Sequence, residues 1–227
     1  MTVAAAPPGS RLERSDGDRI SVILPGEWAR IPLEGADEAN AEISRLVRDR
    51  FPRRDELATL RRETRDMLRD IARDARESDA ALLALSLELV PGVPFAAAIL
   101  VHYFDVPHPE LELPLEVRLA SAVPNGEVLE LDSGLAGREW ELSEPGPENP
   151  DALTTIRYHY VLPTPLAGRW ARVYANVPTA ADTGLITALF DAIVGTIRWR
   201  PDDADELAET GPMGSAPHSA PSQPHLA

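Results

Sequence analysis

The sequence predicts an α+β fold, in which a mostly antiparallel β-sheet is flanked by helices within a single domain. Three observations lead to this prediction. Residues 55–78 repeat their apolar side chains at helical spacing, with arginines on the opposite side. After residue 78 the apolar residues alternate instead, and proline-rich turns separate the alternating runs, as expected for β-hairpins. The length of 227 residues and the apolar content of 44% are typical of one globular domain.

Composition sets the boundaries of this domain. Residues 1–18 are small, polar and proline-bearing, so they bury too little apolar surface to offset the entropy of ordering, and we expect a disordered arm. Residues 19–200 form the predicted domain. Residues 201–227 are acidic at first and then rich in proline and serine, which predicts a disordered tail. The run GPMGS in this tail resembles a cloning scar, with natural low complexity as the alternative.

Two short strands and a helix are expected at the start of the domain. Residues 20–33, ISVILPGEWARIPL, are rich in β-forming side chains and are broken by Pro25 and Gly26. Trp28 is interpreted as an anchor in the core or at a sheet edge. A helix then starts within residues 35–38, repeats its apolar side chains at helical spacing, and ends at Pro52. Its predicted buried positions are Ala39, Ile43, Leu46 and Val47.

Residues 55–78 are the strongest helix prediction, and we expect the rest of the chain to pack against their apolar side. Burying one leucine or isoleucine contributes roughly 1.5–3 kcal/mol. Acidic residues interleave the arginines, which favours a solvated, salt-bridged face over a site for an anionic partner. Expected ion pairs include Arg62–Asp66 and Arg73–Glu77. The apolar side comprises Leu57, Leu60, Thr64, Met67, Leu68, Ile71 and Ala75, and the arginine row Arg62, Arg65, Arg69, Arg73 and Arg76.

The elements after residue 78 are predicted from the periodicity of apolar residues and from the positions of turn-forming residues. Residues 83–90 and 95–104 form a hairpin across PGVP, and its strands are apolar on both faces, which places them centrally in the sheet. The segment PLEVRLASA suits a helix or a strand, and we favour a helix. Residues 127–132 and 137–142 are expected to be edge strands. A closing helix at 183–194, with Ile186, Leu189, Phe190 and Ile193 as its apolar stripe, precedes a short strand at 197–199.

Residues 154–163 and 168–178 form the second clear hairpin and carry the predicted binding surface. A turn centred near Pro165 pairs Tyr158 with Val173, Tyr160 with Ala171, His159 with Arg172, and Arg157 with Tyr174. One sheet face then carries Arg157, His159, Trp170, Arg172 and Tyr174. Arginine and aromatic side chains are favoured in interaction hot spots. The alternative is that these cross-strand pairs simply cover a sheet face.

Composition also excludes several classes of function. The formal charge of −15 and the pI near 4.7 disfavour nucleic acid as a partner, because the chain repels a phosphate backbone. With no cysteine there is no disulfide and no thiolate chemistry. The sequence shows no signal-peptide pattern and no run long enough to span a bilayer, so a cytoplasmic protein is expected. It also lacks GxSxG, P-loop, HExxH and GxGxxG signatures, and no cofactor is expected.

Three weaker candidate sites have competing interpretations. His102 and His159 lie in predicted strands and would form an acid–base cluster with Glu88 if those strands are neighbours, but two structural histidines are favoured. Asp105, His108 and Glu110 provide oxygen and imidazole ligands in one loop, where a plain solvated loop is favoured over a metal site. Arg138 is interpreted as a ligand-binding or, preferably, a turn-bracing arginine.

The order of elements and three motifs resemble the PsbP-like superfamily of α/β/α sandwiches. A strand pair opens with PGEW, antiparallel hairpins follow, and the segment ALFDAIVGTIRW at 188–199 is similar to the closing helix of that superfamily. The segment GLAGR at 134–138 and the strand end YVLPTP at 160–165 are most similar to a group of uncharacterised actinobacterial proteins, some encoded near type VII secretion genes. The resemblance covers about residues 20–199. It implies the fold and an accessory or binding role, with no catalytic residues to carry over.

These observations favour a non-enzymatic protein-binding or accessory module in the bacterial cytoplasm, linked by the resemblance to type VII secretion. The proposed surface consists of Arg157, His159, Trp170, Arg172 and Tyr174, with Arg138 as a further candidate. The first alternative is a small-ligand carrier or sensor with a pocket between the sheet and the long helix. The second is an enzyme that uses His102 and His159. Oligomeric state and the identity of the protein partner do not follow from the sequence.

Overall fold

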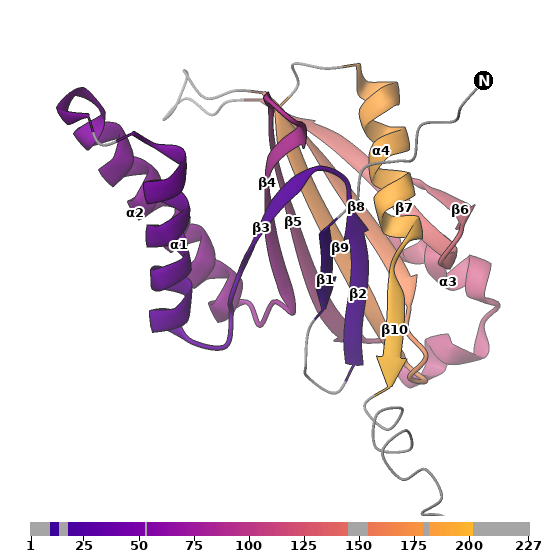
Figure 1. Cartoon of the computed structure of the whole chain (residues 1–227). Coiled ribbons are helices and arrows are strands. Elements are labelled where there is room, and N and C mark those ends of the chain that lie inside the picture. Colours follow the sequence, from indigo (N-terminus) through magenta and orange to yellow (C-terminus); the bar gives the residue numbers. More distant parts are fainter. Residues whose placement is uncertain (1–9, 14–17, 53, 145–153, 179–181, 202–227) are drawn as a thin grey trace, which may run out of the picture.

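Strands and helices follow one another along the chain largely as the sequence predicts (Figure 1). The computed structural model describes residues 10–13, 18–52, 54–144, 154–178 and 182–201. The strands are β1 (Ser10–Glu13), β2 (Asp18–Leu24), β3 (Glu27–Ile31), β4 (Leu82–Val90), β5 (Val93–Asp105), β6 (Glu127–Leu131), β7 (Gly134–Ser143), β8 (Thr155–Pro163), β9 (Arg169–Pro178) and β10 (Arg198–Pro201). The helices are α1 (Ala36–Arg50), α2 (Ala58–Glu77), α3 (Leu115–Ala122) and α4 (Thr183–Gly195), with short 3₁₀ helices at Asp55–Leu57 and His108–Glu112.

These strands form two antiparallel sheets. The large sheet has seven strands in the order β3-β4-β5-β9-β8-β7-β6, and the small sheet has three in the order β1-β2-β10. In Figure 1 the small sheet and α4 lie in front of the large sheet, the α1–α2 hairpin lies beside its β3 edge, and α3 lies near its β6 edge. The predicted α+β class, with a mostly antiparallel sheet in one domain, is confirmed.

Differences from the sequence prediction mostly concern the places that strands take in the sheets. Residues 20–33 form β2 and β3 as predicted, but the two strands join different sheets. Of the two predicted edge strands, β6 is an edge, whereas β7 lies between β6 and β8. Strand β1 pairs with β2 inside the segment that was predicted to be a disordered arm. The rest of that arm, at 1–9 and 14–17, and the tail at 202–227 lie outside the described residues.

One face of the large sheet, here called the inner face, carries the main core. Side chains alternate along β9, so Ala171, Val173, Ala175 and Val177 all point to this face and are buried. Strand β2 and helix α4 close over them. The hydroxyls of Tyr158 on β8 and Thr187 on α4 form a hydrogen bond of 2.9 Å. Thr196, just after α4, accepts a hydrogen bond of 2.9 Å from the backbone N–H of Ile23, so α4 contacts both sheets.

The opposite face, called the outer face, is covered by helices near its two ends. Helices α1 and α2 pack over β3, β4 and β5, and α3 packs over β7 and β8. Gly137 on β7 allows α3 to approach closely, because a Cβ there would lie 2.9 Å from a Val123 methyl. Between these helices the described residues leave the centre of the outer face uncovered, where Tyr174 and Asn176 are exposed.

The long helix forms as predicted, but only part of its predicted apolar side is covered. The residues of that side that are buried or partly buried are Leu57, Thr64, Leu68 and Ala75. Leu60, Met67 and Ile71 are 46%, 54% and 38% exposed. The fully buried positions of α2 are Ala75, which was predicted, and Ala72, which was not, and their small side chains permit close packing on α1 and β4. The α1–α2 hairpin also projects beyond the β3 edge (Figure 1), so the first half of α2 has no strand beneath it. The expectation that the rest of the chain packs against this helix is therefore wrong.

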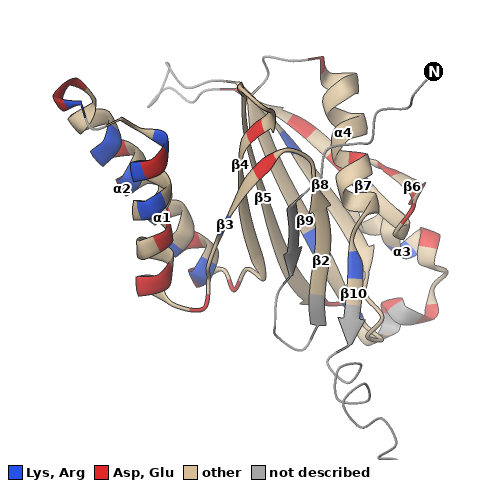
Figure 2. Cartoon of the chain, in the orientation of Figure 1, with Lys and Arg blue, Asp and Glu red and all other residues tan. Residues whose placement is uncertain are grey.

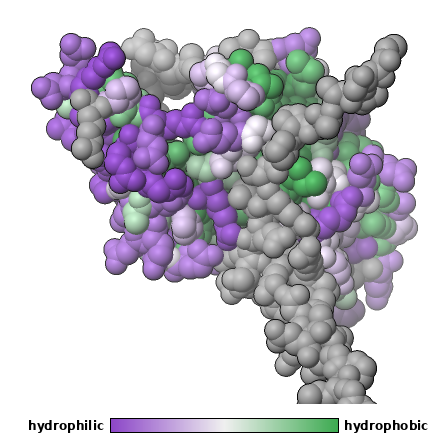
Figure 3. All heavy atoms as spheres, in the orientation of Figure 1, coloured by the Kyte–Doolittle hydropathy of each residue, from purple (hydrophilic) through white to green (hydrophobic). Residues whose placement is uncertain are grey.

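The polar side of α2 is the solvated, salt-bridged face that the sequence predicts. Arginines and acidic residues alternate along the helix (Figure 2), and the surface over α1 and α2 is mostly hydrophilic in Figure 3. Arg73 lies 2.8 Å from Asp70 and 4.0 Å from Glu77, which confirms the second predicted pair. The first predicted pair is wrong, because Asp66 contacts Arg69 at 3.7 Å rather than Arg62.

The hairpin of β8 and β9 has the predicted faces but not the predicted partners. His159 is opposite Tyr174 and Arg157 is opposite Asn176, whereas Arg172 is opposite Val161. The reason is the turn, which is closed by a hydrogen bond of 3.2 Å from the Thr164 N–H to the Arg169 carbonyl and so centres one residue later than predicted. Moving the centre by one residue shifts the pairing by two, which changes every partner and leaves every side chain on its predicted face.

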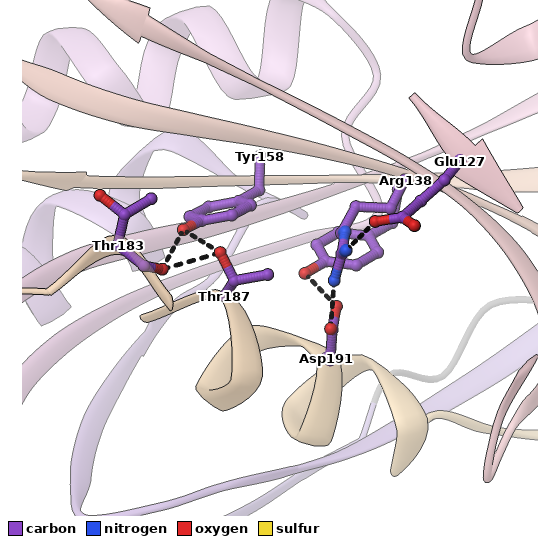
Figure 4. Close-up of polar contacts among 7 residues, drawn as sticks. Glu127, Arg138, Tyr158, Thr183, Thr187 and Asp191 are labelled. Atoms are coloured by element: carbon purple, nitrogen blue, oxygen red, sulfur yellow. Dashed lines mark hydrogen bonds and ion pairs between the residues drawn. The ribbon is translucent and has the colours of Figure 1, made fainter. Parts of the chain in front are cut away.

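A polar cluster on the inner face fixes α4 to the large sheet (Figure 4). Asp191 of α4 forms an ion pair with Arg138 of β7 and accepts a hydrogen bond of 2.8 Å from the Tyr160 hydroxyl. Arg138, with a side chain 11% exposed, also pairs with Glu127 of β6. Burial acts to lower the pKa of Arg138, but its hydrogen bonds to Asp191 and Glu127 outweigh burial and hold that pKa above its ordinary value. Arg138 therefore stays charged between two carboxylates, with its Nε as the one atom of its guanidinium that lacks an acceptor among the described residues.

Removing the carboxylate from this cluster should destabilise the fold. We predict that Asp191→Ala lowers the free energy of unfolding by about 2–3 kcal/mol, because it leaves Arg138 with one anionic partner and Tyr160 with none. Asp191→Asn, which keeps a carbonyl oxygen for Tyr160, should cost less. Urea denaturation of the three proteins measures both values. A loss below about 1 kcal/mol for Asp191→Ala would show that α4 does not depend on this cluster.

Candidate functional site

The uncovered centre of the outer face carries aromatic, basic and acidic side chains in register. Strands β5, β9, β8 and β7 are neighbours, and Leu100, Tyr174, His159 and Glu139 form one row across them. The adjacent row on one side contains His102 and Arg172, and the row on the other side contains Asn176, Arg157 and Glu141. The sheet itself thus places these side chains next to one another.

His159 is held by partners on both neighbouring strands. Its Nδ1 lies 3.0 Å from a Glu139 carboxylate oxygen, and its ring stacks on Tyr174 with ring centroids 5.0 Å apart and planes inclined by 14°. Burial lowers the pKa of His159, the nearby Arg172 lowers that pKa further, and the bond to Glu139 offsets these effects only in part. The imidazole is therefore neutral near pH 7 and donates its Nδ1 proton to Glu139.

His102 lies on the other side of Tyr174. Its ring meets the edge of Tyr174 with centroids 6.0 Å apart, and its Nδ1 lies 3.1 Å from the Ser78 carbonyl oxygen. Burial lowers the pKa of His102 most, and the charge of Arg172 lowers that pKa as well, against the effect of the Ser78 hydrogen bond. Both histidines are consequently neutral near pH 7, and Arg172 is the fixed positive charge between them.

Two arginines of this face have different surroundings. Arg157 lies 3.7 Å from Glu141, and both side chains are exposed, so the pair is a weak surface ion pair. Arg172 stacks over Phe104 with its guanidinium carbon 4.5 Å from the ring centroid. Within the described part of the chain no carboxylate pairs with Arg172, and its buried Nε has no hydrogen-bond acceptor. Arg172 is thus a half-buried cation stabilised by an aromatic ring.

Two cavities meet at Tyr174, and together they are called the outer cleft. The cavity on the β7 side has a volume of about 540 Å³ and is lined by polar residues that include Glu139, Arg157, His159 and Arg172. The cavity on the α2 side has a volume of about 440 Å³ and is mainly apolar, with Ile71, Ala75, Leu83, Leu100 and Asn176 in its lining. The cleft therefore combines a charged half and an apolar half.

The structure brings together most of the predicted surface. Arg157, His159, Arg172 and Tyr174 all line the polar cavity. Trp170 lies on the same face but is 3% exposed, because α3 covers it and Arg118 stacks over its ring at 5.3 Å. A buried tryptophan is a core residue, so the proposal that Trp170 takes part in binding is not supported by its position.

Arg138 does not belong to this face. It pairs with Asp191 on the inner face, in the middle of β7, and neither a ligand-binding nor a turn-bracing position describes it. Sequence analysis also missed Glu139, whose pairing with His159 requires the register of β7 on β8. It missed the proximity of His102 to Arg172 for the same reason.

The weaker candidate sites have different outcomes. His102 and His159 share the outer face, but their strands are not neighbours as the acid–base interpretation required, because β9 lies between β5 and β8. Glu88 is elsewhere, bound to Arg50 at 3.0 Å and to the Gly92 N–H at 2.9 Å. Among the residues that the structure describes, no three histidine, aspartate or glutamate side chains gather as metal ligands, so Asp105, His108 and Glu110 do not form such a group. In the described ranges no helix is long and apolar enough to cross a membrane.

Comparisons with known proteins add no functional information. No family model matches the sequence, and no curated protein matches it significantly. A crystal structure of a protein from Bacteroides thetaiotaomicron VPI-5482 is similar with a TM-score of 0.37 and 8% sequence identity. The similarity covers 54% of this chain and 39% of that chain, so this chain spans well under half the length of that protein. At this level the likeness supports no argument.

The two histidines predict how stability depends on pH. Their folded pKa values lie below the unfolded value of about 6.5, so the unfolded state binds more protons and stability falls as the pH falls. We predict that the stabilisation is complete above about pH 6.5 and is lost as the pH drops through the folded pKa values, at up to about 1.4 kcal/mol per pH unit per histidine.

Urea denaturation at pH 8 and at pH 5.5 tests this dependence. His159→Gln, which keeps a donor for Glu139 but does not titrate, should lose less stability over this interval than the unchanged protein. The exposed His108 provides the control, and His108→Gln should leave the dependence unaltered. Equal losses in all three proteins would refute the assignment to His159.

Proposed function

We propose that this protein is a non-enzymatic binding module that holds a segment of a partner protein in the outer cleft. The observation that carries the proposal is the exposed apolar side of α2, which continues into the apolar half of the cleft through Ile71. Leu60, Met67 and Ile71 together form an exposed apolar stripe that the described part of the chain leaves without cover. Exposed apolar surface of this kind marks interaction sites.

The spacing of this stripe indicates the form of the partner segment. Positions 60, 64, 67 and 71 are separated by four, three and four residues, which is the seam by which one helix packs along another. Binding in which an amphipathic helix lies in an apolar groove uses such a seam. An amphipathic helix that follows α2 and ends over Leu100 and Tyr174 fits the apolar half of the cleft.

Charge also supports a protein partner. The rim of α2 next to the stripe is acidic at Glu63, Asp70, Asp74 and Glu77, and the chain carries a formal charge of −15. A partner helix with basic residues beside its apolar side would be attracted over a long range and held in register at short range. A second copy of α2 is a poorer match, because it would place two acidic rims against each other.

The sequence resemblance supports a proposal about the cellular process in which the protein takes part. It supports an accessory role in an actinobacterial cytoplasm, in association with type VII secretion, with a PsbP-like fold as its framework. The three motif segments contribute Arg138, Tyr160 and Asp191 to one cluster beneath α4. Their position supports a structural role for the motifs, and leaves recognition to the outer face.

A small-ligand carrier or sensor is the second candidate, and one observation favours it. The apolar cavity of about 440 Å³ lies between the sheet and the long helix, where such a pocket is expected from the sequence. The cleft is open along α2, however, and an extended groove suits a polypeptide better than an enclosed small molecule. An enzyme is the third candidate, but no serine, threonine or cysteine is among the described residues that line the polar cavity with His159.

A charge placed in the apolar stripe should abolish partner binding without unfolding the protein. We predict that Met67→Glu loses its co-purified partner from the native host, because a partner helix would have to desolvate the carboxylate. Met67 is 54% exposed, so the melting temperature should stay unchanged. Quantitative mass spectrometry of affinity-purified complexes measures the partner, and circular dichroism measures melting.

Leu185→Glu provides the matched control. Leu185 is 69% exposed on α4, away from the outer face, so the same change there should leave the co-purified proteins as they are. Tyr174→Ala tests the cleft itself and should weaken binding as Met67→Glu does. Identical sets of captured proteins for the unchanged protein, Met67→Glu and Tyr174→Ala would disprove the proposed function.

A further inference from the structure

Arg172 has no anionic partner among the residues that the structure describes, although the protein is strongly acidic. The chain has 37 acidic residues against 22 basic ones, and the neighbouring Arg157 has a carboxylate partner at 3.7 Å. Arg172 is half-buried, stacks on Phe104, and among the described residues has no acceptor for its Nε. A half-buried charge without a partner costs stability, and such costs are concentrated at binding sites.

Other unpartnered polar atoms converge on the same cavity. The Nε2 atom of His159 and the second carboxylate oxygen of Glu139 are buried and have no hydrogen-bond partner in the described structure. Asn125, in the turn between α3 and β6, and Tyr174 also line this cavity. The unpartnered atoms of His159 and Glu139 are both acceptors, because His159 keeps its proton on Nδ1, so the donors toward a ligand in this cavity of about 540 Å³ are the guanidinium of Arg172, the Tyr174 hydroxyl and the Asn125 amide. A guanidinium that has no carboxylate among the described residues, with uncharged donors beside it, is a site for one small anionic group.

We infer that the polar half of the outer cleft binds a carboxylate group, with Arg172 as the principal ligand and with Tyr174 and Asn125 as further donors. A carboxylate is planar and accepts two parallel hydrogen bonds from a guanidinium that is stacked flat on a ring. A phosphate dianion is a poorer match, because Glu139 and Glu141 line the same cavity and would repel the second charge.

This inference deepens the proposed function and rests on it only in treating the outer cleft as a binding surface. The carboxylate comes from an acidic side chain of the bound partner segment or from a free carboxylic acid. Both sources share one chemistry, and the experiment below separates them. It uses small probes and no partner protein, so it succeeds or fails independently of the Met67→Glu experiment.

The test is a titration of the full chain with small probes, in which ¹H–¹⁵N NMR spectra of the arginine side chains monitor binding. The probes are acetate, a capped tripeptide acetyl-Leu-Glu-Leu-amide, and inorganic phosphate, at constant ionic strength. We expect both carboxylates to shift the Arg172 Nε–H signal and to saturate. Arg172→Gln should weaken carboxylate binding by at least about tenfold, the change expected from losing one charge-assisted hydrogen bond.

Arg118→Gln is the matched control. Arg118 also stacks on an aromatic ring and also has an Nε without an acceptor, but it does not line the polar cavity. Its replacement should leave carboxylate binding unchanged. Arg172→Lys, which keeps the charge but not the fork of donors, should bind with intermediate affinity and serves if Arg172→Gln fails to fold. Arg172→Gln removes the stacking on Phe104 but no ion pair within the described fold, so its melting temperature should fall only slightly.

The outcomes decide both the site and the source. Tighter binding of the tripeptide than of acetate would assign the carboxylate to a partner side chain, and the reverse order would assign it to a free acid. The inference is overturned if neither carboxylate shifts the Arg172 signal, if Arg172→Gln and Arg172→Lys bind as the unchanged protein does, or if phosphate binds more tightly than both carboxylates.

Discussion

The structure depends on the alternation of side chains along β9, the middle strand of the large sheet. Ala171, Val173, Ala175 and Val177 face the inner core, where the small sheet and α4 cover them. Arg172, Tyr174 and Asn176 face the opposite way, toward the outer cleft. Because successive residues of a strand point to opposite faces, a single segment both holds the core together and displays the candidate site. The site is therefore as rigid as the sheet that carries it.

The two faces of the large sheet differ in which groups they leave exposed or unpaired. On the inner face Arg138 has two carboxylate partners and Tyr160 donates to Asp191, which holds α4, although the Arg138 Nε has no acceptor among the described residues. On the outer face the described residues leave Arg172 without an anion and leave apolar side chains of α2 exposed. Unsatisfied groups that lie together in one cleft are what a binding partner would complete, and this contrast is the physical basis of the proposed function.

Sequence reasoning identified the faces but not the contacts. The period of two in β8 and β9 assigns Arg157, His159, Arg172 and Tyr174 to one face, and that assignment survives a register error of two residues. Which residues face each other across β8 and β9 depends on the position of the turn after Thr164, and that position could not be predicted from the sequence. The Arg138–Asp191 pair spans 53 residues of chain and requires the position of α4 to be known. Amphipathic spacing likewise shows that α2 has an apolar side. It does not show whether the residues that pack on that side belong to the same chain or to a partner.

The central claim is that adjacent residues of β9 belong to a sealed core and to an open cleft. The chain contains no cysteine, so single cysteines introduced there report accessibility without interference. The most direct measurement is maleimide labelling of Asn176→Cys and Ala175→Cys under native conditions. The account predicts that the cysteine at 176 reacts as fast as a free thiol, whereas the cysteine at 175 reacts only after denaturant unfolds the protein. Equal labelling of the two positions, or protection at 176, would contradict it.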